Sequence, residues 1–526
     1  MLTLHFEAGE YYARISLSER PRVLDAGFTF DETKKRWSTK DARRAYRLIE
    51  HADEDCAMKL KSELRIGPMK PVDQIIYPKH LKPFAHQIKG VKWVTSRFAS
   101  YLAFEAGTGK TIIACLCMNS RMGRALVICP AFLKLNWVKE IETWSVYPFK
   151  IQVVNRLEDK VDPTAEIIIC PDSIISSEPL RAGLEGLRFS FIFIDEAHKF
   201  KTPDAKRTKS IVGYSYKKGN KTYSCPGLHK YAQHVVCFSG TPMPNRTAEL
   251  YTLISHFAPH VFNYADFHTY ALQFCAAYEN QFGWDYTGAS NLEQLHELLT
   301  KDYMLFQDLD SCVDLPAKLP DKIIYLDQPN KKIVTEHMKM LSQITLSELL
   351  QIGIDESNDY DENSILGAVA RLRRQTGEAK VDEAIPIIRS MLAEGHEVVV
   401  FAHHKSVITK LFVGLESYRP FVITGETSNK KRHESVEQFQ SDKTRKLLIA
   451  NIQAAGVGIT LTKACKVVFV EFSFVPAENE QAKSRLRRIG QTRAVQASFI
   501  VWPDSIDHLV LNAHQRKQQI IERVIR

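Results

Sequence analysis

The chain has 526 residues, of which 44% are hydrophobic and 25% charged, and its formal net charge is +9. This composition is that of an ordinary globular protein of several domains, and it excludes a collagen-like or largely disordered chain. No apolar run is long enough for a membrane-spanning helix, and acidic residues in "MLTLHFEAGE" interrupt the apolar core that a signal peptide needs. We therefore expect an intracellular protein without a membrane partner, whose mild excess of base allows a polyanionic ligand.

Residues 1 to about 70 predict a small α+β module. Within them, "AGFTFDETKKRWSTK" alternates as two strands around a turn would, and "DARRAYRLIEHA" gathers its apolar side chains on one face of a helix. Arg43 and Arg44 fall away from that face, where they are either solvated charges or contacts to phosphates. The segment "RIGPMKPVDQ", with its two prolines, predicts a linker to the next part of the chain.

From about residue 80, short apolar runs alternate with helical stretches, which is typical of parallel α/β sheets. The first block contains "RALVICP", "AEIIICP", "FSFIFIDEAH" and "HVVCFSGTP", and a second block contains "HEVVVFAHH", "TRKLLIAN" and "CKVVFVEFS". Between residues 262 and 380 the strand pattern is lost, and the acidic segment "IDESNDYDENS" predicts a loop there. The sequence therefore predicts two α/β lobes, at 71–317 and 318–526, after the N-terminal module at 1–70.

A glycine-rich segment, "EAGTGKT", lies between apolar "YLAF" and helix-like "IIACLCM". A turn of this kind at the start of a helix exposes backbone N–H groups that can cradle phosphates. We expect Lys110 to reach the β- and γ-phosphates of ATP and Thr111 to ligate Mg²⁺. The P-loop pattern has a further glycine where this chain has Phe104, and alone the segment could be a simple helix cap. The expected nucleotide-binding residues of the turn are Gly107, Thr108, Gly109, Lys110 and Thr111.

Two further loops follow strand-like runs. "FIFIDEAH" contains Asp195 and Glu196. An aspartate at a strand end suits Mg²⁺, and the adjacent glutamate can orient and deprotonate an attacking water. In "FSGTPMPN", Ser239 and Thr241 could couple the nucleotide to the second block, although alone this segment would be an ordinary turn. The glycine-rich turn and the acidic pair together predict an ATPase.

A cluster of cations, "QAKSRLRRIGQ" at residues 481–491, lies deep in the second α/β block. On a helix, Arg485 and Arg488 are three positions apart and share a face. A guanidinium stays protonated and offers a fixed set of donors to the charge that builds on the γ-phosphate during transfer. We therefore expect Arg485 and Arg488 to face ATP, and Lys483 and Arg487 to serve solvent or a phosphate backbone. A fully solvated basic helix is the alternative.

From about residue 80 onward, the order and spacing of these motifs resemble a superfamily-two helicase, and more narrowly a Swi/Snf-type DNA translocase. "PFAHQIKGVKWV" is similar to the glutamine-containing entry motif, "LVICPAFLKLNWVKEIETW" to motif Ia, "IDEAHKFKTPDAKRTKSI" to motif II and "FSGTPMPNRTAELYTLISHF" to motif III. "NIQAAGVGITLTKACKVVFVE" resembles motif V, and "QAKSRLRRIGQT" resembles motif VI. "QFGWDYTGASNLEQLHELL" and "RRQTGEAKVDEAI" look like the annealing-helicase branch that remodels forks, and "FTFDETKKRWST" is similar to the HARP-type module that precedes such motors.

The resemblance implies two RecA-like lobes with ATP between them, helical insertions at residues 262–380, and movement along duplex DNA. It implies that Gln87 contacts adenine and that Gly456 and Gln481 also belong to the nucleotide site. It implies nucleic-acid contacts by Lys134, Thr241, Arg246, Thr424, Asn451 and Thr460, together with Arg43 and Arg44 of the module.

The chain departs from the family pattern in a few places. Ser484 stands where motif VI usually has aspartate, and Phe306 and Gln307 stand where the family usually shows paired arginines. These departures concern the grip on DNA and the coupling of the lobes, and they leave the ATPase core intact.

The leading hypothesis is a monomeric DNA-dependent ATPase that uses ATP and Mg²⁺ to remodel branched DNA by branch migration, fork regression or strand annealing. The alternatives are a remodeller that displaces proteins from duplex DNA, a non-hydrolysing DNA-binding scaffold and an RNA helicase. Intact Lys110, Asp195 and Glu196 argue against the scaffold. The absence of an import-like basic run predicts a bacterial or phage protein in the cytoplasm, or a nuclear protein if the host is a eukaryote.

Overall fold

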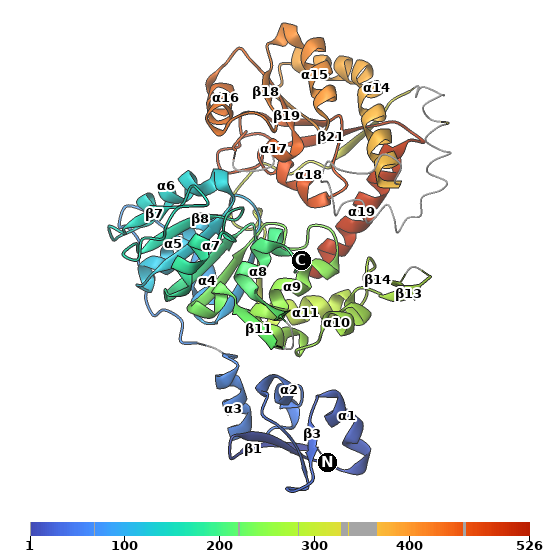
Figure 1. Ribbon diagram of the computed structural model, residues 1–526. Coiled ribbons are helices and arrows are strands. Elements are labelled where there is room, and N and C mark those ends of the chain that lie inside the picture. The colour runs from blue at the N-terminus through green and yellow to red at the C-terminus, as the bar shows by residue number, and fades with distance from the viewer. Residues whose placement is uncertain are drawn as a thin grey trace. The chain divides into compact units, whose positions relative to one another are not determined.

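The computed structural model describes residues 2–67, 69–218, 221–281, 283–327, 335, 365–455 and 459–526. The chain separates into two compact units, each drawn in Figure 1. The first unit comprises Met1–Phe104, Gly109–Pro242 and Thr247–Gln307, and the second comprises Glu105–Thr108, Met243–Arg246 and Asp308–Arg526. Each unit contains one large parallel sheet, so the predicted pair of α/β lobes is confirmed. The units divide after Gln307, before the expected residue 317.

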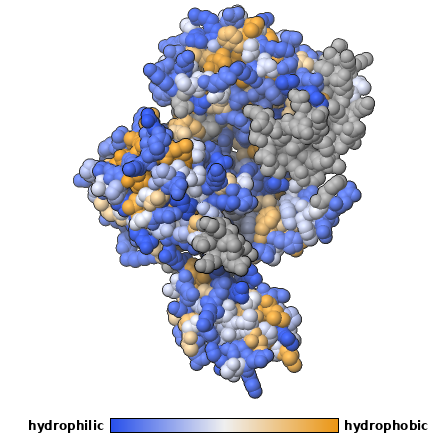
Figure 2. Space-filling view, in the orientation of Figure 1, coloured by the Kyte–Doolittle hydropathy of each residue, from blue (hydrophilic) through white to orange (hydrophobic). Residues whose placement is uncertain are grey.

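The N-terminal module is a four-stranded antiparallel sheet packed against short helices. The strands are β1 (Thr3–Glu7), β2 (Glu10–Arg14), β3 (Thr29–Asp31) and β4 (Arg36–Thr39), in the order β1-β2-β4-β3, and the helices are α1 (Arg20–Asp25), α2 (Ala42–Tyr46) and α3 (Glu54–Glu63). The expected strand pair and helix are confirmed, because β3 pairs with β4 and Ala42 and Ala45 of α2 are buried in the module core. Figure 2 shows hydrophobic surface over α1, where Leu17 and Leu24 are exposed.

The first lobe is built on a seven-stranded sheet in which neighbouring strands are parallel. Its order is β15-β5-β12-β9-β6-β8-β7. The strands are β5 (Ala99–Phe104), β6 (Ala125–Cys129), β7 (Ile151–Val153), β8 (Ile167–Pro171), β9 (Phe189–Asp195), β12 (Ala232–Phe238) and β15 (Met304–Gln307). β5, β6, β8 and β9 are buried along their whole length, as expected for strands covered on both faces.

Helices and two hairpins complete the first unit. The helices are α4 (Ala85–Thr95), α5 (Lys110–Ser120), α6 (Lys134–Trp144), α7 (Glu178–Glu185), α8 (Lys206–Val212), α9 (Tyr251–Phe257), α10 (Phe267–Phe274) and α11 (Leu292–Asp302). The hairpins are β10 (Gly213–Lys218) with β11 (Lys221–Pro226) and β13 (Tyr278–Asn280) with β14 (Gly283–Asp285). None of the helices in the described part of the chain is both long and apolar enough to cross a membrane.

The second lobe is built on a six-stranded parallel sheet in the order β16-β21-β20-β17-β19-β18. The strands are β16 (Lys322–Tyr325), β17 (Val398–Ala402), β18 (Phe421–Ile423), β19 (Leu447–Asn451), β20 (Lys466–Phe469) and β21 (Gln496–Val501). The helices are α14 (Ile365–Ala393), α15 (Lys405–Gly414), α16 (Asn429–Ser441), α17 (Ile452–Ala455), α18 (Pro476–Lys483) and α19 (Ile506–Ile525). Side chains of β17 alternate between two apolar clusters, so both faces of this sheet are buried.

The described part of residues 262–380 contains short strands, although the sequence shows no strand pattern there. This range contains the hairpin of β13 and β14, and it also contains β15 and β16, which form an edge strand of the first and of the second sheet. Each of these two edge strands has only four residues, and β16 has no buried residue, so neither gives the apolar run of a central strand. The acidic segment predicted to form a loop, residues 354–364, lies outside the described residues.

Candidate active site

The glycine-rich turn connects β5 to α5, as predicted. Gly107 and Gly109 have φ angles of +91° and +82°, in the left-handed region that favours glycine. Helix α5 begins at Lys110, so the unpaired N–H groups of its first turn lie at the glycine-rich segment. The Lys110 Nζ atom donates to the carbonyl oxygen of Phe104 at 2.7 Å, which keeps the ammonium group beside the turn. The turn therefore offers a cradle of N–H groups and one cation, which fits the phosphates of a nucleotide.

Phe104 and Gln87 flank this turn. Phe104, where the P-loop pattern has a glycine, is fully buried at the end of β5 in the core of the first lobe. Gln87 of α4 is also buried, and its Oε1 accepts from the backbone N–H of Phe84 at 2.9 Å. A Cβ atom on Gly109 would lie 2.3 Å from Gln87 Nε2, so the amide packs directly against the turn. The structure thus brings Gln87 to the predicted site, and glycine is required at position 109 for space as well as for backbone conformation.

Asp195 and Glu196 lie at the carboxyl end of β9, in the same sheet as β5. Asp195 is buried, and its Oδ2 accepts from the indole Nε1 of Trp137 at 3.0 Å while its Oδ1 accepts from the Glu196 N–H at 3.0 Å. Burial, reinforced by the charge of Glu196, raises the pKa of Asp195 to about 6, against the opposing effect of Lys110. A buried aspartate with a second carboxyl group beside it suits a divalent cation, because Mg²⁺ prefers oxygen ligands. The donor set therefore fits Mg²⁺.

Glu196 has a left-handed backbone, with φ of +51° and ψ of +49°. Such a conformation is costly for a residue with a side chain, and it is tolerated where the surroundings fix it. The Glu196 Oε2 atom lies 3.3 Å from Nδ1 of His198, and the same Nδ1 lies 2.8 Å from the hydroxyl of Ser239. Ser239 in turn accepts from the backbone N–H of Thr241 at 3.0 Å. A chain of polar contacts therefore runs from Glu196 past His198 to the loop after β12, and hydrogen bonds join its members from His198 to Thr241.

Burial lowers the pKa of His198, which favours the neutral ring in this chain of contacts. Ser239 and Thr241 were expected at this site from the sequence, whereas His198 and Trp137 were not. His198 is the last residue of "DEAH", so its place beside the acidic pair was a signal that could have been used. Trp137 lies 58 residues before Asp195, and nothing in its local sequence indicates the hydrogen bond between the two.

In the second unit, the segment that carries the arginines differs from the prediction. Helix α18 ends at Lys483, so Arg485 and Arg488 lie in the turns after it and the argument from a shared helical face was wrong. Arg485 is buried, and its carbonyl oxygen accepts from the N–H of Leu461 at 2.8 Å. Arg488 donates from Nη1 to the hydroxyl of Thr460 at 3.3 Å. The segment is thereby joined to the motif that contains Thr460.

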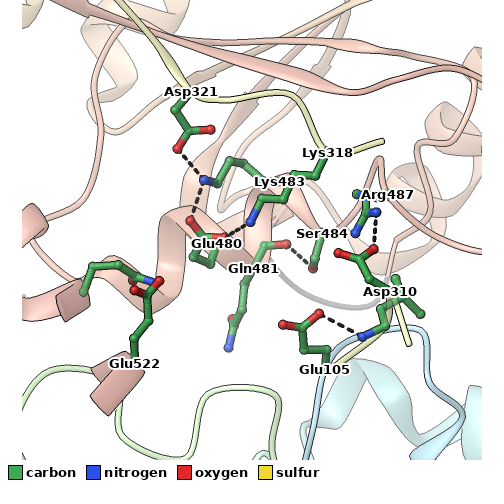
Figure 3. Close-up of polar contacts among 12 residues, drawn as sticks. Glu105, Asp310, Lys318, Asp321, Glu480, Gln481, Lys483, Ser484, Arg487 and Glu522 are labelled. Atoms are coloured by element: carbon green, nitrogen blue, oxygen red, sulfur yellow. Dashed lines mark hydrogen bonds and ion pairs between the residues drawn. The ribbon is translucent and has the colours of Figure 1, made fainter. Parts of the chain in front are cut away.

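Lys483 and Arg487, expected to serve solvent or a phosphate backbone, each pair with a protein carboxylate (Figure 3). Lys483 is buried, and its Nζ lies 2.7 Å from Asp321 Oδ2 and 2.5 Å from Glu480 Oε1. Burial alone would raise the pKa of Glu480, but the ammonium of Lys483 brings it down to about 2. Arg487 pairs with Asp310. Asp321 and Asp310 precede these cations by 162 and 177 residues, so local sequence gave no sign of them, whereas Glu480 is only three residues before Lys483.

The residues expected to contact nucleic acid mostly lie at or beyond the carboxyl ends of strands. Thr241 follows β12, Thr424 follows β18, and Asn451 ends β19, where its Nδ2 donates to the carbonyl oxygen of His403 at 2.7 Å. Lys134 begins α6 after β6, and its Nζ contacts Asn155 Oδ1 at 2.5 Å. Since loops at this edge of a parallel sheet form ligand sites, the placement agrees with a binding role in each lobe.

The remaining predicted site residues either do not lie at the carboxyl ends of strands or fall outside the described residues. Arg246 belongs to the short Met243–Arg246 segment that groups with the second unit, and Gln481 lies on α18. In the N-terminal module, Arg43 is exposed, whereas Arg44 donates from Nη1 to the carbonyl oxygen of Gly27 at 3.0 Å. Gly456 lies outside the described residues.

This chain is similar to two protein-family models and to several known proteins. A family model described as the SNF2-related domain matches residues 86–381, which is more than half of the chain, and one described as the helicase conserved C-terminal domain matches residues 379–490. The SWI/SNF-related matrix-associated actin-dependent regulator of chromatin subfamily A-like protein 1 of Xenopus tropicalis is 29% identical over 453 residues, covering 84% of this chain and 44% of that protein. The DNA annealing helicase and endonuclease ZRANB3 of Homo sapiens is 29% identical over 434 residues, covering 80% of this chain and 38% of that protein.

The chain thus spans less than half the length of these two curated relatives. Among solved structures, the Sulfolobus solfataricus SWI2/SNF2 ATPase core in complex with dsDNA aligns with a TM-score of 0.40 and 19% sequence identity, covering 86% of this chain and 99% of that one.

Proposed function

The chain belongs to the SNF2-related family, and we propose that it is a DNA-dependent ATPase that moves along DNA and remodels branched structures. The observation that carries this proposal is the meeting of two motifs at one sheet edge. Lys110 follows β5, buried Asp195 and adjacent Glu196 lie at the carboxyl end of β9, and both strands flank β12 in the same parallel sheet. A phosphate cradle, a cation and an acidic pair at neighbouring strand ends are the parts that ATP hydrolysis needs. The similarity to a relative named as a DNA annealing helicase supports branched DNA as the substrate.

At the nucleotide, each residue has a distinct role. Lys110 binds the β- and γ-phosphates, and Glu196 orients the attacking water and accepts its proton. Thr111 and Asp195 would hold Mg²⁺, which when bound neutralises charge on the phosphates. Gln87 contacts adenine, and Gly456 and Gln481 also belong to the nucleotide site. From the second lobe, Arg485 and Arg488 supply guanidinium groups to the charge that develops on the γ-phosphate.

The polar chain from Glu196 to Thr241 couples hydrolysis to DNA binding. His198 contacts both Glu196 and Ser239, so a change in the position of the glutamate shifts the loop after β12. Thr241 in that loop is one of the residues that we assign to the DNA backbone. The others are Lys134, Arg246, Thr424, Asn451 and Thr460, with Arg43 and Arg44 in the N-terminal module.

The N-terminal module directs the motor to branched DNA and takes no part in ATP chemistry. It has a core of its own, formed by both its sheet and its helices, so it can act as a separate unit. We place the protein in the cytoplasm of a bacterium or a phage-infected cell, acting as a monomer.

The proposal is tested by ATPase rates measured with single-stranded, duplex, forked and four-way DNA, and with RNA, with Glu196→Gln as the inactive control. We expect stimulation by duplex DNA and a further rise with forked or four-way DNA. Stimulation by RNA alone, or a rate unaffected by any nucleic acid, would refute the assignment.

A further inference from the structure

A hollow lined by cations lies at the amino ends of the strands of the first lobe. Its volume is about 1050 Å³, and no acidic residue is among its described lining residues. We call this hollow the basic groove, because five cations line it: Lys61, Arg65, Arg124, Arg188 and Lys230.

The basic groove is distinct from the proposed ATP site. Arg124 directly precedes β6, Arg188 precedes β9 and Lys230 lies in the turn before β12, whereas the ATP residues follow the other ends of their strands. The opposite wall comes from the N-terminal module, where Lys61 lies on α3 and Arg65 follows this helix. The two features therefore lie at opposite edges of one sheet.

The walls of the groove are joined by hydrogen bonds and aromatic contacts. Arg47 of the module donates from Nη2 to the carbonyl oxygen of Tyr264 at 2.8 Å, and the rings of Tyr46 and Tyr264 lie 5.3 Å apart. After the module, the N–H of Met69 donates to the carbonyl oxygen of Ser96 at 2.7 Å. The module thus has defined contacts with the lobe that supplies the other wall.

The charges of the groove are not neutralised by protein carboxylates. Within the part of the chain that the structure describes, none of the five cations forms an ion pair with an acidic side chain. Arg124 donates to the carbonyl oxygens of Pro163 and Ala165, at 2.6 and 3.0 Å, and these carry no net charge. Like charges gathered in this way repel one another, and a bound polyanion would relieve the repulsion.

Two aromatic rings also line the hollow. Arg65 lies over the ring of Phe98 at 5.5 Å, and Arg188 lies over the ring of Tyr231 at 5.6 Å. Both rings are partly exposed. Exposed rings interleaved with cations are the pattern by which proteins hold unpaired bases together with their phosphates.

We propose that the basic groove binds a single-stranded segment of DNA. Pockets for drug-sized ligands measure about 300–1,000 Å³, so this hollow accepts a strand of a few nucleotides, while a duplex would have to remain outside it. The inference rests on the proposed function only in taking DNA as the substrate. The strand that becomes unpaired at a branch lies in the groove, away from the duplex along which the motor moves.

The test compares two triple variants of the full chain that remove equal charge. The groove variant is Arg65→Ala, Arg188→Ala and Lys230→Ala, and the matched control is Arg22→Ala, Arg156→Ala and Lys443→Ala, all at exposed positions. Binding is measured by fluorescence anisotropy with a labelled deoxythymidine oligonucleotide of about 10 nucleotides, within the usual site size for single strands. The same series is run with blunt duplex DNA and with inorganic polyphosphate, and duplex-stimulated ATPase is measured in parallel.

We expect the groove variant to bind the oligonucleotide roughly tenfold more weakly and its log–log salt dependence to fall by about 2, at about 0.7 per lost phosphate contact. The control variant should stay close to the wild type. The inference would be overturned if both variants lost the same affinity for the oligonucleotide, or if the groove variant bound it as the wild type does. It would also be overturned if the groove variant lost as much affinity for duplex DNA or polyphosphate. If duplex-stimulated ATPase persists in such a case, only the groove assignment fails. If the wild type shows no DNA stimulation, the proposed function itself fails.

Discussion

Replacing Trp137 with phenylalanine tests whether Mg²⁺ binding at Asp195 depends on the hydrogen bond that the indole N–H donates to this carboxylate. The indole N–H donates to Asp195 Oδ2 at 3.0 Å, and both side chains are buried. A hydrogen bond to a charged group contributes about 1.5–3 kcal/mol, which corresponds to roughly 10–150-fold in an equilibrium constant. Loss of a group that orients a metal ligand lowers metal affinity or activity by about 10–100-fold, which agrees with that range.

The assay is a Mg²⁺ titration of DNA-stimulated ATPase at saturating ATP. Without the indole N–H, the Asp195 carboxylate is no longer fixed by this side chain, so we expect the Mg²⁺ concentration for half-maximal rate to rise by about tenfold or more. Excess Mg²⁺ should recover much of the turnover, which a general loss of folding would not allow.

Trp144→Phe is the matched control, because Trp144 ends the same helix α6 and packs against the same core. It should keep the Mg²⁺ requirement of the wild type. An unchanged requirement in a folded Trp137→Phe variant, or the same shift in both variants, would refute the role assigned to the hydrogen bond.

Three further predictions concern the same motor. Lys110→Ala should abolish hydrolysis and weaken nucleotide binding, while Glu196→Gln should keep ATP binding and stop turnover; wild-type rates in either variant would contradict the site. Arg488→Ala should lower turnover by roughly 10³-fold or more with ATP binding nearly intact, and Arg487→Ala should lower it less, so equal losses would indicate a generally damaged segment. Lys483→Met should destabilise the second lobe by roughly 2–3 kcal/mol. This is less than the roughly 3–5 kcal/mol lost when a fully buried ion pair is broken, because the carboxylates that pair with Lys483 are partly exposed. An unchanged thermal midpoint would count against this prediction.

The sequence predicted the elements whose signal is local. The strands β9 and β12 are long apolar runs, and the loops after them carry Asp195, Glu196, Ser239 and Thr241, so both the sheet and its site were predictable. The glycine-rich turn was predictable for the same reason, because its glycines and the helix after it are adjacent in the chain.

The contacts of the arginine cluster could not be predicted, because they join distant parts of the chain. Buried Lys483 forms an ion pair with Asp321, and Arg487 forms one with Asp310. Both cations look solvated when only their neighbours in sequence are considered. The end of α18 was also missed, because no glycine or proline follows Lys483 until Gly490. In the structure, the hydroxyl of Ser484 donates to the carbonyl oxygen of Gln481 at 2.7 Å as the helix ends.

The most direct test of the central claim is fork regression by the purified chain. A labelled model fork is incubated with ATP and Mg²⁺, and conversion of the fork into paired parental and paired nascent strands is followed by native gel electrophoresis. We expect conversion by the wild type with ATP, and none by Glu196→Gln or by the wild type without ATP. A wild type that hydrolyses ATP with DNA but leaves the fork unchanged, or converts it equally well without hydrolysis, would contradict the account.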